Sequence, residues 1–224
     1  MQDLTLVIPA KYESESLPIF LEEISNLTCK KLVILEETDN KTIQSIKNFE
    51  RIELIFQKNK GYGAALLEGI RCTQTKFFCI INADGSMNPK YLANMLNKTK
   101  INNLDFLFAS RYEKHDSGSD DDNIITYIGN YIFTKIGNIF FSLKITDILF
   151  TYVLGKTNEF NSLNLTSYDF TLCVEFPIKA NRYGFKLSTI PSYERGRIGG
   201  KKKVNAFKDG LLILIKMIKL FFIK

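Results

Sequence analysis

The sequence of 224 residues contains no tryptophan, one histidine and only four cysteines. The cysteines form no CxxC pair and no spacing typical of metal ligands, which excludes the common thiolate zinc sites. Cys72 and Cys79 lie in or near apolar segments, so we expect buried free thiols, as in a reducing cytosol. His115 lies in an acidic stretch, where we expect no catalytic role.

Familiar nucleotide-binding signatures are also missing. The chain contains no Walker A loop. Gly61 and Gly63 form a Gly-x-Gly pair, but Leu66 stands where a dinucleotide fingerprint has its third glycine, and the pair follows the third expected strand instead of the first. We also expect no secretory signal, because the first strand begins within a few residues of Met1.

The charge is uneven along the chain. The net charge is +6, with lysine and arginine crowding the last thirty residues and acids dominating residues 116–122. A basic tail of this kind favours phosphates or an anionic membrane surface as partners, and we expect no nucleic-acid partner. The length suits one large domain with a sizeable core.

Apolar runs alternate with helical patterns through the first half of the chain. This strict alternation predicts an α/β fold, with a mostly parallel central sheet and helices on both faces. The expected strands cover residues 4–9, 31–35, 52–57, 77–81, 104–109 and 186–190. The expected helices cover residues 15–26, 42–49, 64–74, 89–100 and 168–183. Polar residues follow the strands, so we expect them to converge along one edge of the sheet.

Asp84 is the best single candidate for a functional residue. It follows the fully apolar run at residues 77–81, where open α/β sheets bind ligands. Asn82 and Ser86 offer neutral oxygens beside it, and Mg²⁺ or Mn²⁺ binds through one or two carboxylates together with substrate phosphates. We therefore predict a metal site at Asp84, Asn82 and Ser86. The alternative is an Asp-Gly turn that simply leaves a strand.

The second half of the chain has a different pattern. Residues 113–123 are polar and acidic, and we expect a solvated surface loop. Residues 124–145 are strongly apolar, with a polar stripe of Thr126, Asn130, Thr134 and Asn138 spaced four apart. Such a helix either belongs to the core or lies against lipid.

The tail at residues 204–224 forms a separate unit after a domain at residues 1–203. At about 100° per residue, Asn205, Lys208, Asp209, Lys216 and Lys219 fall on one side of a helix and apolar residues cover the rest. A transmembrane position would bury lysines at a cost of roughly 2.5–3.5 kcal/mol each. We predict an amphipathic helix attached peripherally to the cytoplasmic face of a membrane. The alternative is a helix packed on the core of the domain.

Several segments together resemble family 2 glycosyltransferases of the GT-A fold, in particular the dolichyl- and polyprenyl-phosphate sugar transferases. They occur in the family's order over roughly residues 4–205. Residues 7–15 resemble its opening "viPayNEe", 60–65 its "kGkGaA", and 82–89 its metal motif "DADgshpP". Residues 110–112 match "sRy", 146–147 match "sD", and 197–203 resemble "RxxGxSK".

This resemblance implies a nucleoside-diphosphate sugar as donor, with Mg²⁺ or Mn²⁺ as cofactor. Donor binding would involve the ends of the first three strands and the metal loop: Pro9, Ala10, Tyr12, Glu13, Glu36, Glu37, Asp39, Lys60, Gly61, Gly63, Asn82 and Ala83. Phosphate or acceptor binding would involve Arg111, Arg197 and Lys203.

The sequence departs from the family pattern at three places. Asn82 replaces the first acid of the metal motif, and Glu36-Glu37 replaces a pair of aspartates. Residues 149–153 read LFTYV where the family has "TSGFR", which implies a different acceptor pocket.

Two kinds of acceptor require different chemistry. A polyprenyl phosphate needs no general base, because a phosphomonoester has its second pKa at about 6 and is mostly ionised at neutral pH. A glycan hydroxyl, as in envelope polysaccharide synthesis, needs a carboxylate base, for which Asp147 and Glu175 are candidates. We predict inverting, metal-dependent transfer of a hexose to a polyprenyl phosphate, with Asp84 as the main catalytic residue. The alternatives are transfer to a glycan hydroxyl and a non-catalytic relative that only binds nucleotide sugars.

Overall fold

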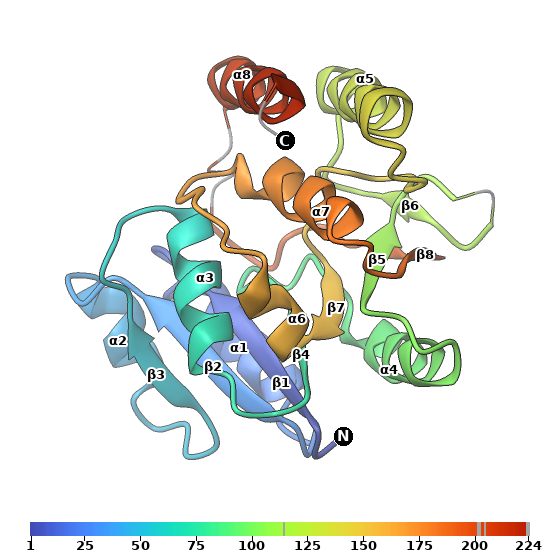
Figure 1. Ribbon diagram of the computed structural model, residues 1–224. Coiled ribbons are helices and arrows are strands. Elements are labelled where there is room, and N and C mark those ends of the chain that lie inside the picture. The colour runs from blue at the N-terminus through green and yellow to red at the C-terminus, as the bar shows by residue number, and fades with distance from the viewer. Residues whose placement is uncertain (114, 201–202, 204, 223–224) are drawn as a thin grey trace.

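A seven-stranded sheet organises the protein, as the computed structural model shows for residues 1–113, 115–200, 203 and 205–222 (Figure 1). The strand order is β3-β2-β1-β4-β7-β5-β8. The strands are β1 (Leu4–Pro9), β2 (Lys30–Leu35), β3 (Glu53–Phe56), β4 (Phe77–Ile80), β5 (Phe106–Ser110), β7 (Val153–Lys156) and β8 (Leu187–Pro191). All pair in parallel except β7, which runs antiparallel between β4 and β5. The predicted α/β fold with a mostly parallel sheet is confirmed.

The apolar strands are buried on both faces of the sheet. In β4, Phe77 and Cys79 belong to one core cluster, whereas Phe78 and Ile80 belong to the other. This alternation explains why the whole run is apolar, because successive side chains point to opposite faces. Phe78 is fully buried, and its ring lies 5.1 Å from that of Phe160 in an edge-on arrangement.

Helices cover both faces of the sheet. The first face carries α1 (Ser16–Glu23), α2 (Asn40–Ile46) and α4 (Leu92–Ile101), which follows the 3-10 turn η1 (Pro89–Tyr91). The second face carries α3 (Tyr62–Cys72), α6 (Thr157–Ser162) and α7 (Leu172–Arg182). Asp39 caps α2 by accepting a hydrogen bond from the backbone N–H of Thr42.

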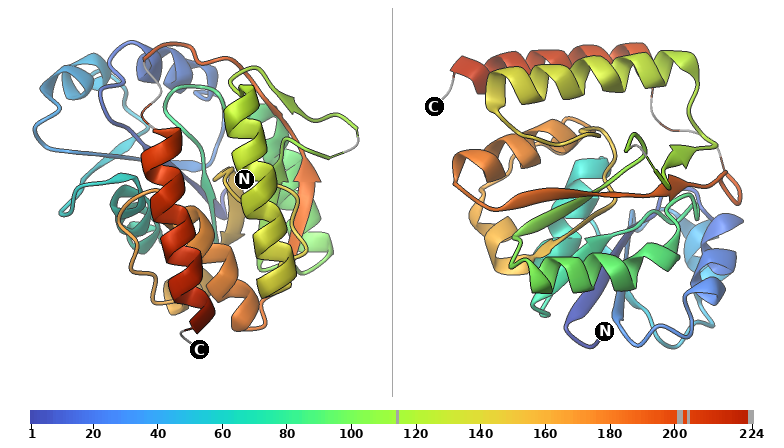
Figure 2. Two further views of the ribbon diagram at one scale, coloured as in Figure 1. Left: turned by 90° about the horizontal axis from the view of Figure 1, so that it is seen from above. Right: turned by 90° about the vertical axis from the view of Figure 1, so that its right-hand side faces the viewer.

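Two long helices, α5 (Ile124–Phe141) and α8 (Ala206–Phe222), form a further layer outside α7. They lie side by side at one end of the molecule (Figures 1 and 2), and the rings of Phe140 and Phe221 meet edge-on with centroids 5.7 Å apart. On α8, Ile213, Met217 and Leu220 are buried against the domain. None of the helices in the described part of the chain is both long and apolar enough to cross a bilayer.

Some elements differ from the sequence prediction. Residues 146–167 carry no predicted element, yet they contain β7 and α6. The stretch at residues 113–123 is not a plain loop, because β6 (Gly118–Ser119) pairs in parallel with β9 (Tyr193–Glu194). Cys79 is buried as predicted, but Cys72 is exposed at the end of α3.

Candidate functional site

The carboxyl ends of β1, β2, β4, β5 and β8 meet at one edge of the sheet, because these strands share one direction. At this edge, the loop at residues 82–86 leaves β4. The loop turns at Gly85, whose φ of 73° lies in the region that favours glycine. A Cβ atom at Gly85 would lie only 2.3 Å from Cδ1 of Ile198, so a larger residue would require the Ile198 side chain to move, in addition to straining the backbone.

Asp84 has a buried side chain that is held from two sides. Its Oδ1 accepts a hydrogen bond from the backbone N–H of Ser86 at 3.1 Å. Its Oδ2 lies 2.7 Å from Nη1 of Arg197. Arg197 also donates to both carboxylate oxygens of Asp121, at 3.2 and 3.3 Å. Asp84, Arg197 and Asp121 therefore form one chain of ion pairs at the edge of the sheet.

The segment after β1 lies next to the end of β2. The backbone N–H of Ala10 donates to the carbonyl of Ile34, and that of Tyr12 donates to Oδ2 of Asp39 at 2.6 Å. Tyr12 adopts a φ of 53° and projects into solvent with 67% of its surface exposed. Buried Asp39 thus holds the backbone at residue 12 and caps α2 in addition.

The other charged residues predicted for donor binding differ in their contacts. Glu36 pairs with Lys11 at 3.0 Å, whereas Glu37 and Lys60 are exposed at the same edge. Glu13 is buried, accepts a hydrogen bond from the hydroxyl of Ser16 and pairs with Lys203. The structure thus places Pro9, Ala10, Tyr12, Glu13, Glu36, Glu37 and Asp39 around the ends of β1 and β2.

Gly61 and Gly63 do not form an open phosphate cradle. A Cβ atom at Gly61 would lie 2.2 Å from the carbonyl oxygen of Tyr168, and one at Gly63 would lie 2.4 Å from that of Ser167. The backbone N–H of Ala64 donates to Tyr168 at 3.0 Å, so protein carbonyls already occupy the start of α3. The role of these glycines in donor binding stays a prediction; in this structure the backbone of residues 167–169 lies against them.

Asn82 is oriented by a residue that the sequence analysis missed. The hydroxyl of Tyr62 donates to Oδ1 of Asn82 at 3.0 Å and lies 2.6 Å from the hydroxyl of Thr151. Burial raises the pKa of Tyr62, which therefore stays a neutral donor. Tyr62 lies between the two glycines of the Gly-x-Gly pair, so its position in that motif was a signal for its role.

Arg111 is held by buried carboxylates. Its Nε donates to Oδ2 of Asp147 at 2.7 Å, and its Nη2 donates to Oδ1 of Asp147 at 3.0 Å. Nη1 donates to Glu194 at 3.0 Å, and the side chain is only 9% exposed. Phosphate binding by Arg111 stays a prediction, and it would require the guanidinium to leave some of these contacts.

Asp147, the other predicted candidate for a general base, is bonded to Arg111 and Asn130. It is fully buried and accepts hydrogen bonds from the backbone N–H of Arg111, from the Arg111 guanidinium and from Nδ2 of Asn130. Asp147 thus accepts four hydrogen bonds from the protein, two of them from the guanidinium of Arg111, one from its backbone and one from Asn130. Oδ1 of Asn130 accepts a hydrogen bond from the backbone N–H of Leu149, so both ends of the Asn130 carboxamide are hydrogen-bonded.

Glu175 belongs to another ion cluster, beneath α8. It is buried, pairs with Lys179 at 2.9 Å and with Lys216 of α8 at 3.2 Å, and accepts from the backbone N–H groups of Thr166 and Ser167. Burial alone would raise its pKa, but the hydrogen bonds and the two lysines lower it to about 2. The role of Glu175 as a general base stays a prediction, and the lowered pKa counts against it, because a carboxylate with so low a pKa is a weak base at neutral pH.

Residues of the acidic stretch and of β9 also contact Arg111 and its neighbours. Asp122 pairs with Arg111 at 3.4 Å and accepts a hydrogen bond from the hydroxyl of Tyr112. Glu194 accepts from Ser119 and Arg111; its pKa is raised chiefly by burial. Sequence reasoning missed Asp121, Asp122 and Glu194, although the density of acids at residues 116–122 was a signal.

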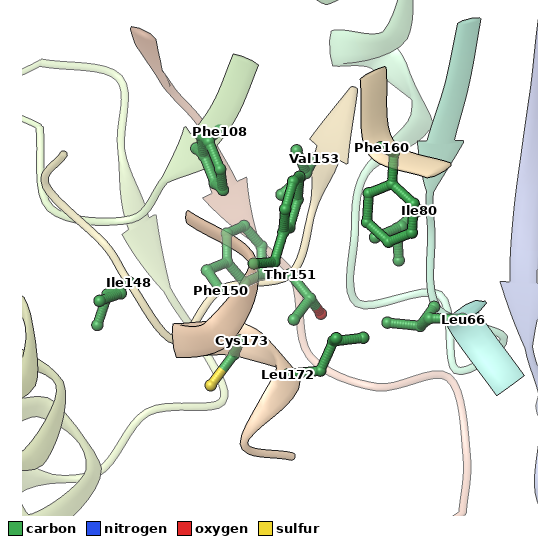
Figure 3. Close-up of a pocket in the computed structure, with 11 residues that line it drawn as sticks. Leu66, Ile80, Phe108, Ile148, Phe150, Thr151, Val153, Phe160, Leu172 and Cys173 are labelled. Carbon is green, nitrogen blue, oxygen red and sulfur yellow. The ribbon is translucent and has the colours of Figure 1, made fainter. Parts of the chain in front are cut away.

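A small cavity lies behind the site, between the sheet and α7 (Figure 3). Its volume is about 10 Å³, room for one water molecule at most. It is lined by Leu66, Ile80, Phe108, Ile148, Phe150, Thr151, Val153, Phe160, Leu172, Cys173 and Phe176. Its size and apolar lining exclude a nucleotide, so this cavity is a packing defect of the core.

The metal loop can be tested for its fit to a divalent cation. Among the described residues, no three His, Cys, Asp or Glu side chains gather to form a protein-only metal site. The hydroxyl of Ser86, however, is buried and has no hydrogen-bond partner within the described part of the chain. Asp84 and Ser86 therefore fit a cation of the Mg²⁺ or Mn²⁺ type that takes most of its ligands from phosphates and water. Asn82 would have to share its oxygen with Tyr62.

Comparison with known proteins bears on the family and the fold. A sequence profile of the family described as "Glycosyl transferase family 2" matches residues 5–161, which is more than half of the chain. The fold is similar to glucosyl-3-phosphoglycerate synthase from Mycobacterium tuberculosis, solved with Mn²⁺, UDP-glucose and phosphoglyceric acid, at 12% identity and a TM-score of 0.68 over 99% of this chain and 80% of that chain. It is also similar to mannosyl-3-phosphoglycerate synthase from Rubrobacter xylanophilus, at 13% identity and a TM-score of 0.69 over 96% and 72% of the two chains.

These matches bear on the predicted resemblance at two levels. The family and its GT-A-like fold are confirmed. The narrower likeness to polyprenyl-phosphate sugar transferases stays a prediction, because the similar structures named above are synthases of glycosyl-3-phosphoglycerates. Identities of 12–13% carry the fold and not the substrates.

Proposed function

The chain belongs to glycosyl transferase family 2, and we propose that it moves a hexose from a nucleoside diphosphate, with inversion, onto a polyprenyl phosphate at a membrane surface. The donor lies at the edge formed by β1, β2 and β4, and the acceptor approaches from the side of α5. Mg²⁺ or Mn²⁺ is the proposed cofactor, since the glucosyl-3-phosphoglycerate synthase from Mycobacterium tuberculosis was solved with either ion.

At the donor site, each group of residues has a distinct role. Residues 9–13 form a wall for the nucleoside, and Glu36 and Glu37 accept hydrogen bonds from the base or the ribose. Asp84 and Ser86 would hold the cation, which neutralises charge on the leaving diphosphate when it is bound. Arg197 and Lys203 supply further positive charge to the diphosphate.

The burial and hydrogen bonding of two carboxylates are the observation that favours a phosphate acceptor. Asp147 and Glu175 are both buried and fully bonded, so neither has the free lone pairs that deprotonation of a hydroxyl would require. A phosphate oxygen needs no such base, because it is already ionised at neutral pH. An acceptor that attacks through a phosphate is therefore favoured over one that attacks through a hydroxyl.

The exposed faces of α5 and α8 support a lipid-linked acceptor. These two helices carry sixteen of the twenty-four exposed large hydrophobic residues in the described part of the chain. They are Ile124, Ile125, Tyr127, Ile128, Tyr131, Ile132, Ile139, Phe140, Phe207, Leu211, Leu212, Leu214, Ile215, Ile218, Phe221 and Phe222. Exposed Lys135, Lys208 and Lys219 accompany them and suit anionic headgroups. An apolar surface of this extent is typical of a binding face.

This apolar face begins beside the donor site. An open hollow of about 780 Å³ is lined by Asp122, Asn123, Ile124, Ile125 and Tyr127, at the start of α5. Asp121, the preceding residue, pairs with Arg197, which pairs with Asp84. A prenyl chain lying along α5 would thus bring its phosphate toward Asp84, which gives the two substrates a common meeting point.

The acceptor can be identified from the labelled product. The full-length protein would be incubated with Mn²⁺, a panel of radiolabelled UDP- and GDP-hexoses, and vesicles that contain a polyprenyl monophosphate. We expect the label in a lipid-phosphate-linked sugar, with no product when the free polyprenol replaces the monophosphate. Label transferred to a glycan hydroxyl or to phosphoglycerate would refute this acceptor, and binding of donor without any product would indicate a non-catalytic relative.

Attachment to membranes through α5 and α8 predicts the effect of a charge placed on their exposed faces. Ile128 of α5 and Ile218 of α8 are each 49% exposed. Replacing both with glutamate should weaken binding to anionic vesicles about tenfold or more, because two apolar anchors are lost and two repulsive charges are gained. Vesicle flotation at physiological salt measures the bound fraction.

A matched control comes from the other end of the molecule. Ile101 at the end of α4 is 81% exposed, and Ile101→Glu should leave vesicle binding unchanged. Wild-type protein that stays entirely with the soluble fraction would contradict membrane attachment, and so would equal losses in the control and in the double variant.

A further inference from the structure

The segment at residues 195–200, here called the strap, lies directly across the metal loop. The backbone N–H of Arg195 donates to the carbonyl of Ser86 at 2.9 Å, and that of Ile198 donates to the carbonyl of Asp84 at 2.9 Å. The Arg195 guanidinium donates twice more to the carbonyl of Gly85, at 2.7 and 3.1 Å. The strap thus grips three consecutive carbonyls of the loop that carries Asp84.

From the strap, Arg197 reaches the carboxylate that the proposed function assigns to the cation. Nη1 of Arg197 lies 2.7 Å from Oδ2 of Asp84, and these side chains are only 21% and 6% exposed. A similar pairing lies close by, where Lys203 contacts buried Glu13. Two positively charged side chains, Arg197 and Lys203, therefore neutralise two carboxylates of the predicted donor site.

A guanidinium in this position has a definite electrostatic role. A buried carboxylate without a partner is costly, so Arg197 stabilises Asp84 when nothing else does. A divalent cation at Asp84 would compete with Nη1, because two positive charges next to one carboxylate oxygen repel each other. A diphosphate offers the released guanidinium a new pair of anionic oxygens with matching geometry.

We propose that Arg197 is a built-in counter-cation which occupies Asp84 in the ligand-free protein and exchanges with the metal–diphosphate. The divalent cation replaces the guanidinium on Asp84, and the guanidinium turns to the diphosphate. Cation and diphosphate then bind as a pair, because the cation alone must compete with Arg197. This inference rests on the proposed function in one respect, namely that Asp84 is the cation's protein ligand.

The test measures binding of two probes without any sugar donor. Mn²⁺ alone is titrated into full-length protein by electron paramagnetic resonance at fixed ionic strength. We expect Arg197→Gln to bind Mn²⁺ about tenfold more tightly than wild type, because the competing charge is gone. With Mn²⁺ saturating, the same variant should bind inorganic pyrophosphate about tenfold more weakly, because the diphosphate has lost its guanidinium.

Two further variants make the result specific. Arg51→Gln removes an exposed arginine that precedes β3, at the edge of the sheet opposite the metal loop, and should leave Mn²⁺ affinity unchanged. Arg197→Lys keeps the charge without the planar fork, and its Mn²⁺ affinity should lie between those of wild type and Arg197→Gln. Thermal unfolding checks that each variant is folded.

The outcomes separate this inference from the proposed function. The exchange is refuted if neither Arg197 variant binds Mn²⁺ more tightly than wild type does. The transfer of the guanidinium to the diphosphate is refuted if the affinity of Arg197→Gln for pyrophosphate is unchanged. Sugar transfer by wild type is assayed in parallel. Transfer that depends on Mn²⁺, together with unaltered Mn²⁺ affinity in the variants, would refute the exchange alone, whereas absence of transfer would refute the proposed function.

Discussion

Asp84→Asn is expected to lower Mn²⁺-dependent sugar transfer about 10²–10³-fold, which corresponds to roughly 3–4 kcal/mol of lost transition-state stabilisation. The amide keeps the shape of the carboxylate but cannot offset the charge of a divalent cation. Asp84 is the only carboxylate in the loop at residues 82–86, so no neighbour in that loop can take over. The measurement is the initial rate of hexose transfer over a range of Mn²⁺ concentrations.

Asp121→Asn is the matched control for this substitution. Asp121 also pairs with Arg197, but it lies on the acidic stretch instead of the metal loop. Its substitution removes the same charge and likewise keeps the shape of the side chain, and it should leave transfer within severalfold of wild type. Transfer by Asp84→Asn at the wild-type rate and with the wild-type dependence on Mn²⁺ would place the cation elsewhere and refute the assignment of Asp84.

The parts of the fold that could be predicted are those whose pattern is local. β1, β2 and β4 are buried on both faces, so each forms an apolar run that is recognisable without knowledge of its neighbours. Because parallel strands end at the same edge, the positions of Asp84, Glu13 and Asp39 relative to one another follow from the alternation alone. The edge that carries the candidate site was therefore predictable.

β7 shows where local reasoning stops. It is four residues long and contains Gly155 and Lys156, so it has no distinctive strand pattern. Its place in the sheet depends on distant residues, since a Cβ atom at Gly155 would lie 2.4 Å from the ring of Phe106. The antiparallel insertion between β4 and β5 therefore follows from tertiary packing, which propensities do not encode.

The roles of the arginines were unpredictable for a similar reason. Arg111 follows β5 at the site edge, where a free arginine would bind phosphate, but its partners Asp147 and Glu194 lie 36 and 83 residues away in the sequence. The same applies to Gly61, whose need for glycine comes from the backbone at Tyr168. In both cases, the residue type suits phosphate binding, but in the folded protein the residue contacts a segment that is distant in the sequence.

The Arg111–Asp147 cluster leads to the largest expected effect on stability. Asp147→Ala should lower the free energy of unfolding by about 3–5 kcal/mol, because it leaves the largely buried guanidinium of Arg111 and the carboxamide of Asn130 without their shared acceptor. The remaining acids, Asp122 and Glu194, contact only Nη1 of Arg111. Urea unfolding at pH 7, followed by circular dichroism, measures the change.

An exposed ion pair provides the comparison for Asp147. Asp3 pairs with Lys100 at 3.3 Å, but its side chain is 62% exposed, so Asp3→Ala should cost less than about 1 kcal/mol. If the two substitutions destabilise the protein equally, the cluster is not a structural centre. Asp147 would then be a candidate for a general base, and a hydroxyl acceptor would be as well supported as a phosphate acceptor. The stability of this one variant therefore tests the chemistry proposed for the site as well as its packing.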